Sequence, residues 1–194
     1  MLVTNKEILS TAKAEGYAVG AFNINNLETL LAVSEASVEE RSPAIVAVTP
    51  SAIKYAGLTY LVGMVKTATE SASVPMSLHL DHGDNVETVS KCIDAGFTSV
   101  MIDGSHLNFE ENISLTKRVV DSAHRRGVSV EAEFGRLAGV EESTVEEKEA
   151  ILTDPNAAKD FVEQTDVDAL AVAIGTSHGA YKFKAEPKLD FERL

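Results

Sequence analysis

The chain has 194 residues, 44% of them hydrophobic and 24% charged, a composition that predicts one globular domain and excludes a disordered chain. Its 17 basic and 30 acidic residues give a formal net charge of −13, which argues against a nucleic-acid partner, because phosphate binding needs clustered Lys and Arg. The only cysteine, Cys92, can form no internal disulfide, and no secretory signal or membrane-spanning run is present, so we expect a cytoplasmic protein without a membrane partner.

Strands and helices are predicted to alternate along the chain. Thr4 and Glu7 have capping-box spacing, and Gly16 ends the first helix. Short apolar runs predict strands over 17–23, 44–48, 75–80, 98–102, 128–133 and 168–174. The helices between them are predicted over 27–40, 57–71, 86–95, 109–126 and 155–164. Six such units without a GxGxxG turn favour an α/β fold of the (β/α)8 TIM-barrel type over a dinucleotide-binding sheet.

Acidic and histidine side chains stand where the later strands end. Asp81 and His82 follow the third strand and Asp103 the fourth, while Glu133 ends the fifth and His178 follows the sixth. The carboxyl ends of barrel strands face the active site, so we expect these side chains to meet. Zinc takes imidazole nitrogens, here from His82 and His178, while Asp103 and Glu133 could supply oxygens or orient the imidazoles. The pattern predicts a zinc-type centre.

Other candidate residues have simpler interpretations. His79 lies inside a strand and is expected in the core, as is Cys92 in its apolar stretch. His106 either supports the site or caps a loop, and His124 is expected at the surface near a helix end. Residues 136–153 carry five glutamates and form too long a connection for an ordinary βα loop, so they are either a solvated insertion or an active-site lid.

Five stretches of the sequence resemble the class II, zinc-dependent ketose-bisphosphate aldolases. They are AFNINNLET (21–29), LHLDHG (78–83), SVMIDGS (99–105), VEAE (130–133) and AIGTSHGAY (173–181). The resemblance runs over essentially the whole chain. Residues 168–179 are especially similar to the tagatose-bisphosphate branch, and fructose-bisphosphate members are also close.

The resemblance implies roles for the strand-end residues. Asp81 resembles the acid that protonates the oxygen of the departing aldehyde during reversal of the aldol step. His82 and His178 resemble two of the three catalytic zinc ligands. Asp103 and Glu133 resemble the ligands of a second metal position.

Four further positions match substrate-handling residues of the family. Glu141 resembles the base that moves a proton at the dihydroxyacetone phosphate carbon. Gly179 resembles a backbone contact to that substrate and to a monovalent cation. Asn23 and Thr49 match substrate contacts by position.

The implied activity is reversible cleavage of tagatose- or fructose-1,6-bisphosphate to dihydroxyacetone phosphate and glyceraldehyde 3-phosphate, through an enediolate that zinc stabilises. The implied partners are the phosphorylated sugar and further copies of the chain, as a dimer or tetramer.

The family's third zinc histidine and its Gly-Ser-Gly phosphate loop have no counterpart before Leu194. We therefore expect residues 1–194 to be one catalytic barrel domain that stops before strands seven and eight, with little activity and poor solubility when expressed alone. An inactive barrel fragment or non-catalytic subunit, and a zinc-dependent barrel hydrolase, remain as alternative interpretations.

Overall fold

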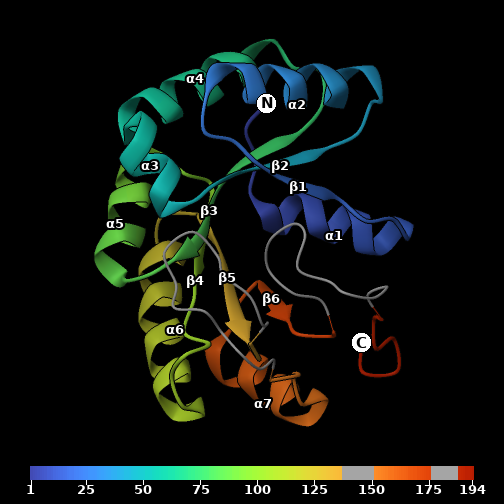
Figure 1. Ribbon diagram of the computed structural model, residues 1–194, viewed down its shortest axis with the longest axis vertical. Helices are drawn as coiled ribbons and strands as arrows, with labels where there is room; N and C mark the ends of the chain where they lie inside the picture. The colour runs from blue at the N-terminus through green and yellow to red at the C-terminus, as the bar shows by residue number, and fades with distance from the viewer. Residues whose placement is uncertain (137–150, 176–187) are drawn as a thin grey trace.

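The structure is a computed structural model that describes residues 1–136, 151–175 and 188–194 (Figure 1). Its elements are α1 (Asn5–Glu15), β1 (Gly20–Asn23), α2 (Leu27–Glu39), β2 (Ala44–Val48), α3 (Pro50–Ala56), α4 (Leu58–Ser71), β3 (Met76–Gly83), α5 (Val86–Ala95), β4 (Ser99–Ile102), α6 (Phe109–His124), β5 (Ser129–Phe134), α7 (Pro155–Thr165) and β6 (Ala169–Val172). The predicted alternation of strands and helices is confirmed over these residues.

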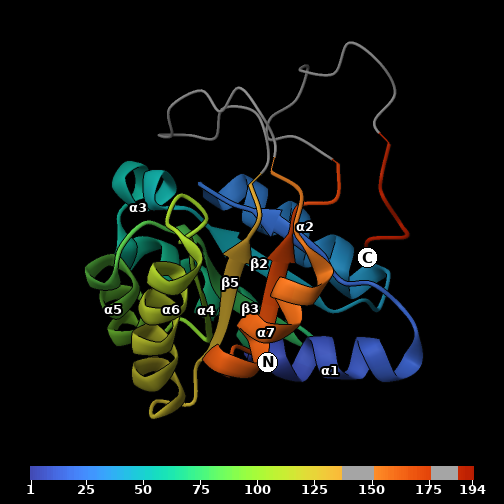
Figure 2. The same cartoon turned by 90° about the horizontal axis from the view of Figure 1, so that it is seen from below.

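The described strands form one six-stranded sheet in the order β1-β2-β3-β4-β5-β6, and each neighbouring pair is parallel. Parallel neighbours need a crossover connection, and here helices supply it. Figure 1 shows the sheet curving inside an arc of helices, and Figure 2 shows α1 lying across the end at which the strands begin. This half-barrel confirms the predicted incomplete TIM-barrel-like fold.

The main hydrophobic core lies between the strands and the helices that cover them. Val46, Leu78, Val100 and Val130 on successive strands belong to it, each almost fully buried. A cluster of phenylalanines extends the core where α6 and α7 meet β5; the ring centroids of Phe109, Phe134 and Phe161 lie 5.5 to 6.1 Å apart. In the described ranges, no helix is long and apolar enough to cross a bilayer.

Several predicted boundaries differ from the structure for identifiable reasons. A helix that the sequence analysis missed, α3, begins at Pro50, where the Thr49 side chain accepts a hydrogen bond from the Ala52 N–H. The first strand was predicted to begin at residue 17, but it begins at Gly20, because pairing with β2 starts at Gly20. The third strand runs on to Gly83, beyond its predicted end at residue 80.

A polar cluster ties the amino-terminal ends of the strands to the helices. The Asp168 carboxylate, just before β6, accepts hydrogen bonds from Lys6 Nζ at 2.8 Å, His124 Nε2 at 2.7 Å and the Val130 N–H at 2.8 Å. His124 was predicted to be a surface residue acting on the helix dipole; it is instead a half-buried partner of Asp168. The core assignments of His79 and Cys92 are confirmed.

Candidate active site

A cavity of about 170 Å³ opens at the carboxyl ends of β3, β5 and β6. Its lining residues are Asp81, His82, Met101, Glu131, Glu133, Ala171, Val172 and Ala173. Three of the strand-end residues predicted from the sequence therefore share one cavity. This is the end of a parallel barrel sheet at which catalytic residues are expected.

Asp81 and His82 owe their positions to an irregularity in β3. The pairing of β3 with β4 shifts register between Leu80 and Gly83. Within that shift His82 adopts a φ of +47°, a left-handed conformation that is uncommon for a residue with a side chain. A Cβ at Gly83 would collide with the backbone oxygen of Met101, so the close approach of the two strands requires glycine there. Such bulges redirect side chains and recur beside active sites.

His82, Asp103 and Glu133 form a candidate metal site. Their ligand atoms all lie within 4.8 Å of one another; His82 Nδ1 is 3.2 Å from Asp103 Oδ2 and 3.6 Å from Glu133 Oε2. Four donors at zinc distances in a tetrahedron lie roughly 3.3–3.6 Å apart. The two spacings are close to this range, and one imidazole with two carboxylates is a donor set that zinc accepts. The residues present therefore fit a divalent ion.

The carboxylate of Asp103 is held in its ionised form. Burial alone would raise its pKa, but hydrogen bonds from His82 and from the Ser105 N–H, at 2.9 Å, outweigh burial and lower the pKa to about 2. A carboxylate must be deprotonated to bind a metal. Asp103 is therefore ready to act as a ligand at neutral pH.

Glu133 is positioned through its backbone. The buried Asn112 side chain on α6 donates a hydrogen bond to the Glu133 carbonyl oxygen at 2.9 Å, and Thr116 donates to Asn112 Oδ1 at 3.3 Å. A Cβ at Gly104 would collide with the Asn112 amide. This packing fixes the end of β5, and with it the Glu133 carboxylate, beside His82.

Asp81 stands next to this metal cluster and is oriented by β1. Asn23 Nδ2 donates a hydrogen bond to Asp81 Oδ2 at 2.7 Å, while Asp81 Oδ1 is 3.8 Å from His82 Nε2. Asn23 was predicted as a substrate contact, and here its amide directs the Asp81 carboxylate. Thr49, predicted in the same role, is buried and caps α3.

Glu131 lines the same cavity and was given no role by the sequence analysis. Burial raises the pKa of Glu131 to about 7, and the nearby Asp81 carboxylate adds to this rise. Beneath it, burial lowers the pKa of His79 to about 3, so His79 is neutral. The sequence did contain a pattern that could have identified Glu131. It lies two residues before Glu133 in a predicted strand, and this spacing places both side chains on one face of the sheet.

Glu141, His178 and Gly179 lie outside the described residues. The described residues that flank them are held together. Arg136 and Ile151 exchange two backbone hydrogen bonds of 2.8 Å, and the Asp190 N–H donates to the Ile174 oxygen at 2.8 Å. Both pairs of flanking residues lie at the carboxyl ends of β5 and β6, on the side of the cavity.

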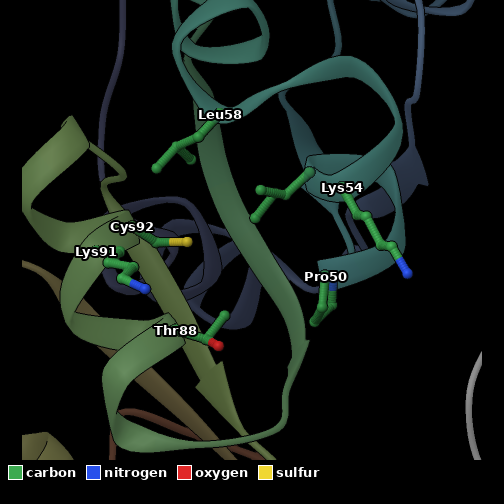
Figure 3. Close-up of a pocket in the computed structure, with 7 residues that line it drawn as sticks. Pro50, Lys54, Leu58, Thr88, Lys91 and Cys92 are labelled. Atoms are coloured by element: carbon green, nitrogen blue, oxygen red, sulfur yellow. The ribbon is translucent and has the colours of Figure 1, made fainter.

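A second cavity, of about 220 Å³, lies among α3, α4 and α5 (Figure 3). Its described lining residues offer the amines of Lys54 and Lys91, the Thr88 hydroxyl and the buried Cys92 thiol. Lys91 is already paired with Glu87 at 2.7 Å, and burial raises the pKa of Cys92 to about 12, so this thiol is not a nucleophile. The cavity at the strand ends is the better candidate for an active site.

Comparison with known proteins gives one consistent result. The family model of class-II fructose-bisphosphate aldolase matches residues 3–194. A fructose-bisphosphate aldolase from Helicobacter pylori (strain ATCC 700392 / 26695) is 57% identical over 196 residues, and one from Thermus caldophilus is 56% identical over 195 residues. Each alignment covers 100% of this chain and 64% of the relative, so the chain spans 64% of the length of these relatives.

A solved structure agrees with this result. A candidate fructose-1,6-biphosphate aldolase from Coccidioides immitis superposes with a TM-score of 0.88 at 37% identity, covering 97% of this chain and 66% of that one. The family match extends over nearly the whole sequence, and the half-barrel carries its acidic and histidine residues at the strand ends. The chain therefore belongs to the class-II fructose-bisphosphate aldolase family.

Proposed function

We propose that this chain provides the metal-binding and proton-transferring part of a class II ketose-bisphosphate aldolase. The reaction is reversible aldol cleavage of a ketose 1,6-bisphosphate to dihydroxyacetone phosphate and glyceraldehyde 3-phosphate. The observation that carries this proposal is the cluster of His82, Asp103 and Glu133 beside Asp81, in a chain of this family. The names of the relatives favour the fructose over the tagatose substrate.

The proposed metal ligands are His82 and Glu133, with Asp103 as a further or alternate ligand, and with His178 completing the set from outside the described residues. When bound, a zinc ion supplies Lewis-acid stabilisation of negative charge on the three-carbon fragment. The carboxylates of this chain would keep the ion in place, and the bulge at His82 would aim the imidazole.

The proposed proton carrier is Asp81. In cleavage its carboxylate accepts the proton of the hydroxyl whose carbon becomes the aldehyde, and in condensation it returns that proton to the aldehyde oxygen. Asn23 donates to Asp81 Oδ2 and thereby leaves Oδ1 to face the reacting hydroxyl. Glu141 is proposed as the base for the dihydroxyacetone phosphate carbon. Gly179 is proposed as a contact to substrate and to a monovalent cation.

The roles of Thr49 and of subunit assembly are also proposed. Thr49 would contact substrate only if the α3 cap opens, because its hydroxyl is buried. The assembly is proposed to be a homodimer or homotetramer.

The His82→Ala variant tests this proposal, with His106→Ala as the matched control because His106 is an exposed histidine outside the metal cluster. In the complete protein, we expect His82→Ala to lose most bound zinc, measured by plasma mass spectrometry, and nearly all release of triose phosphate, while the control keeps both. Stoichiometric zinc and normal turnover in His82→Ala would refute the proposed site. Ester or amide hydrolysis without triose phosphate release would favour a zinc hydrolase instead.

A further inference from the structure

A buried polar network lies beneath the candidate active site. His79 Nδ1 on β3 is 2.9 Å from Ser99 Oγ on β4 and 3.3 Å from Asn5 Nδ2 on α1. The Ser77 hydroxyl donates to Asn5 Oδ1 at 2.5 Å. All four side chains are buried, and burying so many polar groups is costly unless each is hydrogen-bonded. The network therefore needs an explanation beyond packing.

The hydrogen bonds determine which nitrogen of His79 carries the proton. Asn5 Oδ1 accepts from Ser77, so Asn5 presents its NH2 group to His79 Nδ1. Because Nδ1 accepts from Asn5 or Ser99, the proton of the neutral imidazole lies on Nε2. His79 Nε2 is 3.4 Å from Glu131 Oε2, so the N–H faces an acceptor. The network thus ends in an N–H group that lies near the Glu131 carboxyl group.

Glu131 faces the cavity on its other side. Its side chain is 25% exposed, against 4% for His79, and it lines the cavity together with Asp81 and Glu133. Glu131 lies two residues before Glu133 on the same face of β5, which places it about 7 Å deeper along the strand. Within the described residues it is not part of the three-residue metal cluster.

We propose that Glu131 contacts the substrate directly, accepting a hydrogen bond from a hydroxyl group of the sugar phosphate, and that His79 is the positioning residue that holds it. This assignment rests on the proposed aldolase function and deepens it. His79 Nε2 lies 3.4 Å from Oε2, so the proposal assigns the ligand hydroxyl to Oε1. Glu131 in this position would select a polyhydroxylated chain, because an aliphatic chain would give Oε1 no hydrogen-bond donor.

The test measures binding of fructose 1,6-bisphosphate to the complete, zinc-loaded protein by calorimetry, together with the zinc content of each variant. Glu131→Gln should weaken binding of the bisphosphate by roughly 3- to 10-fold, the range for one lost hydrogen bond, while zinc content is unchanged. His79→Leu should weaken it in the same direction, and His79→Gln, which keeps an N–H donor, should recover part of the loss. Thr69→Ala is the matched control, because it removes a buried hydrogen bond, from Thr69 Oγ1 to the Val65 oxygen at 2.9 Å, that lies on α4 outside this network.

Each outcome decides the assignment. Unchanged binding in Glu131→Gln would overturn it, and loss of zinc in that variant would make Glu131 a metal ligand instead. Equal weakening in Thr69→Ala and His79→Leu would show that His79 has only a structural role. If the complete wild-type protein, loaded with zinc, binds no bisphosphate, the proposed function itself fails. If the wild type binds it and Glu131→Gln binds it equally well, only the assignment of Glu131 fails.

Discussion

The Asn23–Asp81 hydrogen bond shows how a single amide can direct a carboxylate across two strands of the sheet. Asp81→Asn keeps the shape and the contact with β1 but removes the ability to accept a proton. We expect this variant to retain its zinc and to cleave substrate roughly 10²-fold more slowly or worse, as is typical of general acid–base groups. Single-turnover kinetics with a zinc assay provide the measurement.

The control for Asp81→Asn is Asp84→Asn, an exposed carboxylate outside the cavity. It should be indistinguishable from the wild type. Loss of zinc from Asp81→Asn, with the rate restored by added metal, would instead identify Asp81 as a ligand.

Gly83 carries the second prediction at the residue scale. An alanine there would place its Cβ against the Met101 backbone oxygen, which cannot move away without disturbing β4. We expect Gly83→Ala to reduce the free energy of unfolding by about 1–3 kcal/mol, as overpacking does, and to weaken zinc binding because His82 shifts with the bulge. Urea denaturation and zinc titration measure the two effects.

Gly63 offers a matched control on α4, since an added Cβ there meets nothing within 4 Å. Replacing glycine by alanine in a helix interior raises the free energy of unfolding by up to about 1 kcal/mol. A Gly83→Ala protein as stable as Gly63→Ala, with normal zinc affinity, would show that the bulge tolerates a side chain.

At the scale of single elements, Asp168 links α1, α6, β5 and β6. Burial alone would raise its pKa, but the hydrogen bonds from Lys6, Val130 and His124 outweigh burial and lower the pKa below the ordinary value of 3.8. A carboxyl whose pKa is lowered by folding stabilises the native state above its unfolded pKa, and this contribution is lost as the pH falls through the folded value.

We therefore expect Asp168→Asn to be less stable than the wild type at pH 7, with the difference shrinking as the pH falls below 3.8. Urea midpoints of both proteins from pH 7 to pH 2.5 measure this convergence. A constant difference over the whole range would mean that the charge of Asp168 is not the stabilising feature. The control is Asp121→Asn, which changes an exposed aspartate on α6. It should leave the urea midpoint unchanged.

The sequence predicted elements best where local chemistry defines their ends. Asn85 caps α5 and Gly96, with a φ of +105°, ends it, and the predicted range 86–95 is the observed one. Strand ends were less predictable, because a strand extends only as far as its partner pairs with it. The bulge at His82 depends on how β3 approaches β4, which no local pattern encodes. His124 was assigned wrongly because its partner, Asp168, lies 44 residues away.

The candidate site was predicted in part for the same reasons. Its members follow from strand ends, which periodicity locates, and His82, Asp103 and Glu133 do meet in the structure. The support for them was not predictable. Asn112 reaches Glu133 from a helix, and His79 reaches Glu131 across the sheet; both contacts exist only once the strands are in register.

At the scale of the whole molecule, exposed apolar side chains gather along β1 and α2. Phe22, Leu27, Leu31 and Val38 are each between 40% and 48% exposed, and Leu31 and Val38 line a groove between α2 and α4. Apolar side chains grouped on one surface favour association. We expect the Leu31→Gln, Val38→Gln double variant to self-associate less than the wild type in sedimentation velocity experiments.

The control is Tyr55→Gln, which removes a still more exposed large side chain, 76% exposed, from α3, outside this groove. It should leave the sedimentation profile unchanged. A wild-type chain that is monomeric at all concentrations tested would contradict the prediction, as would equal association of all three proteins.

The consecutive strand order affects how the sheet folds and how it unfolds locally. Each strand pairs with the next one along the sequence, so the sheet can grow from the middle outward without threading distant segments together. β2, β3, β4 and β5 have a neighbour on both sides, whereas β1 and β6 have one in the described part of the chain. Amide protons of β3 should therefore exchange with deuterium most slowly, and those of β1 should exchange by local fraying before the whole sheet opens.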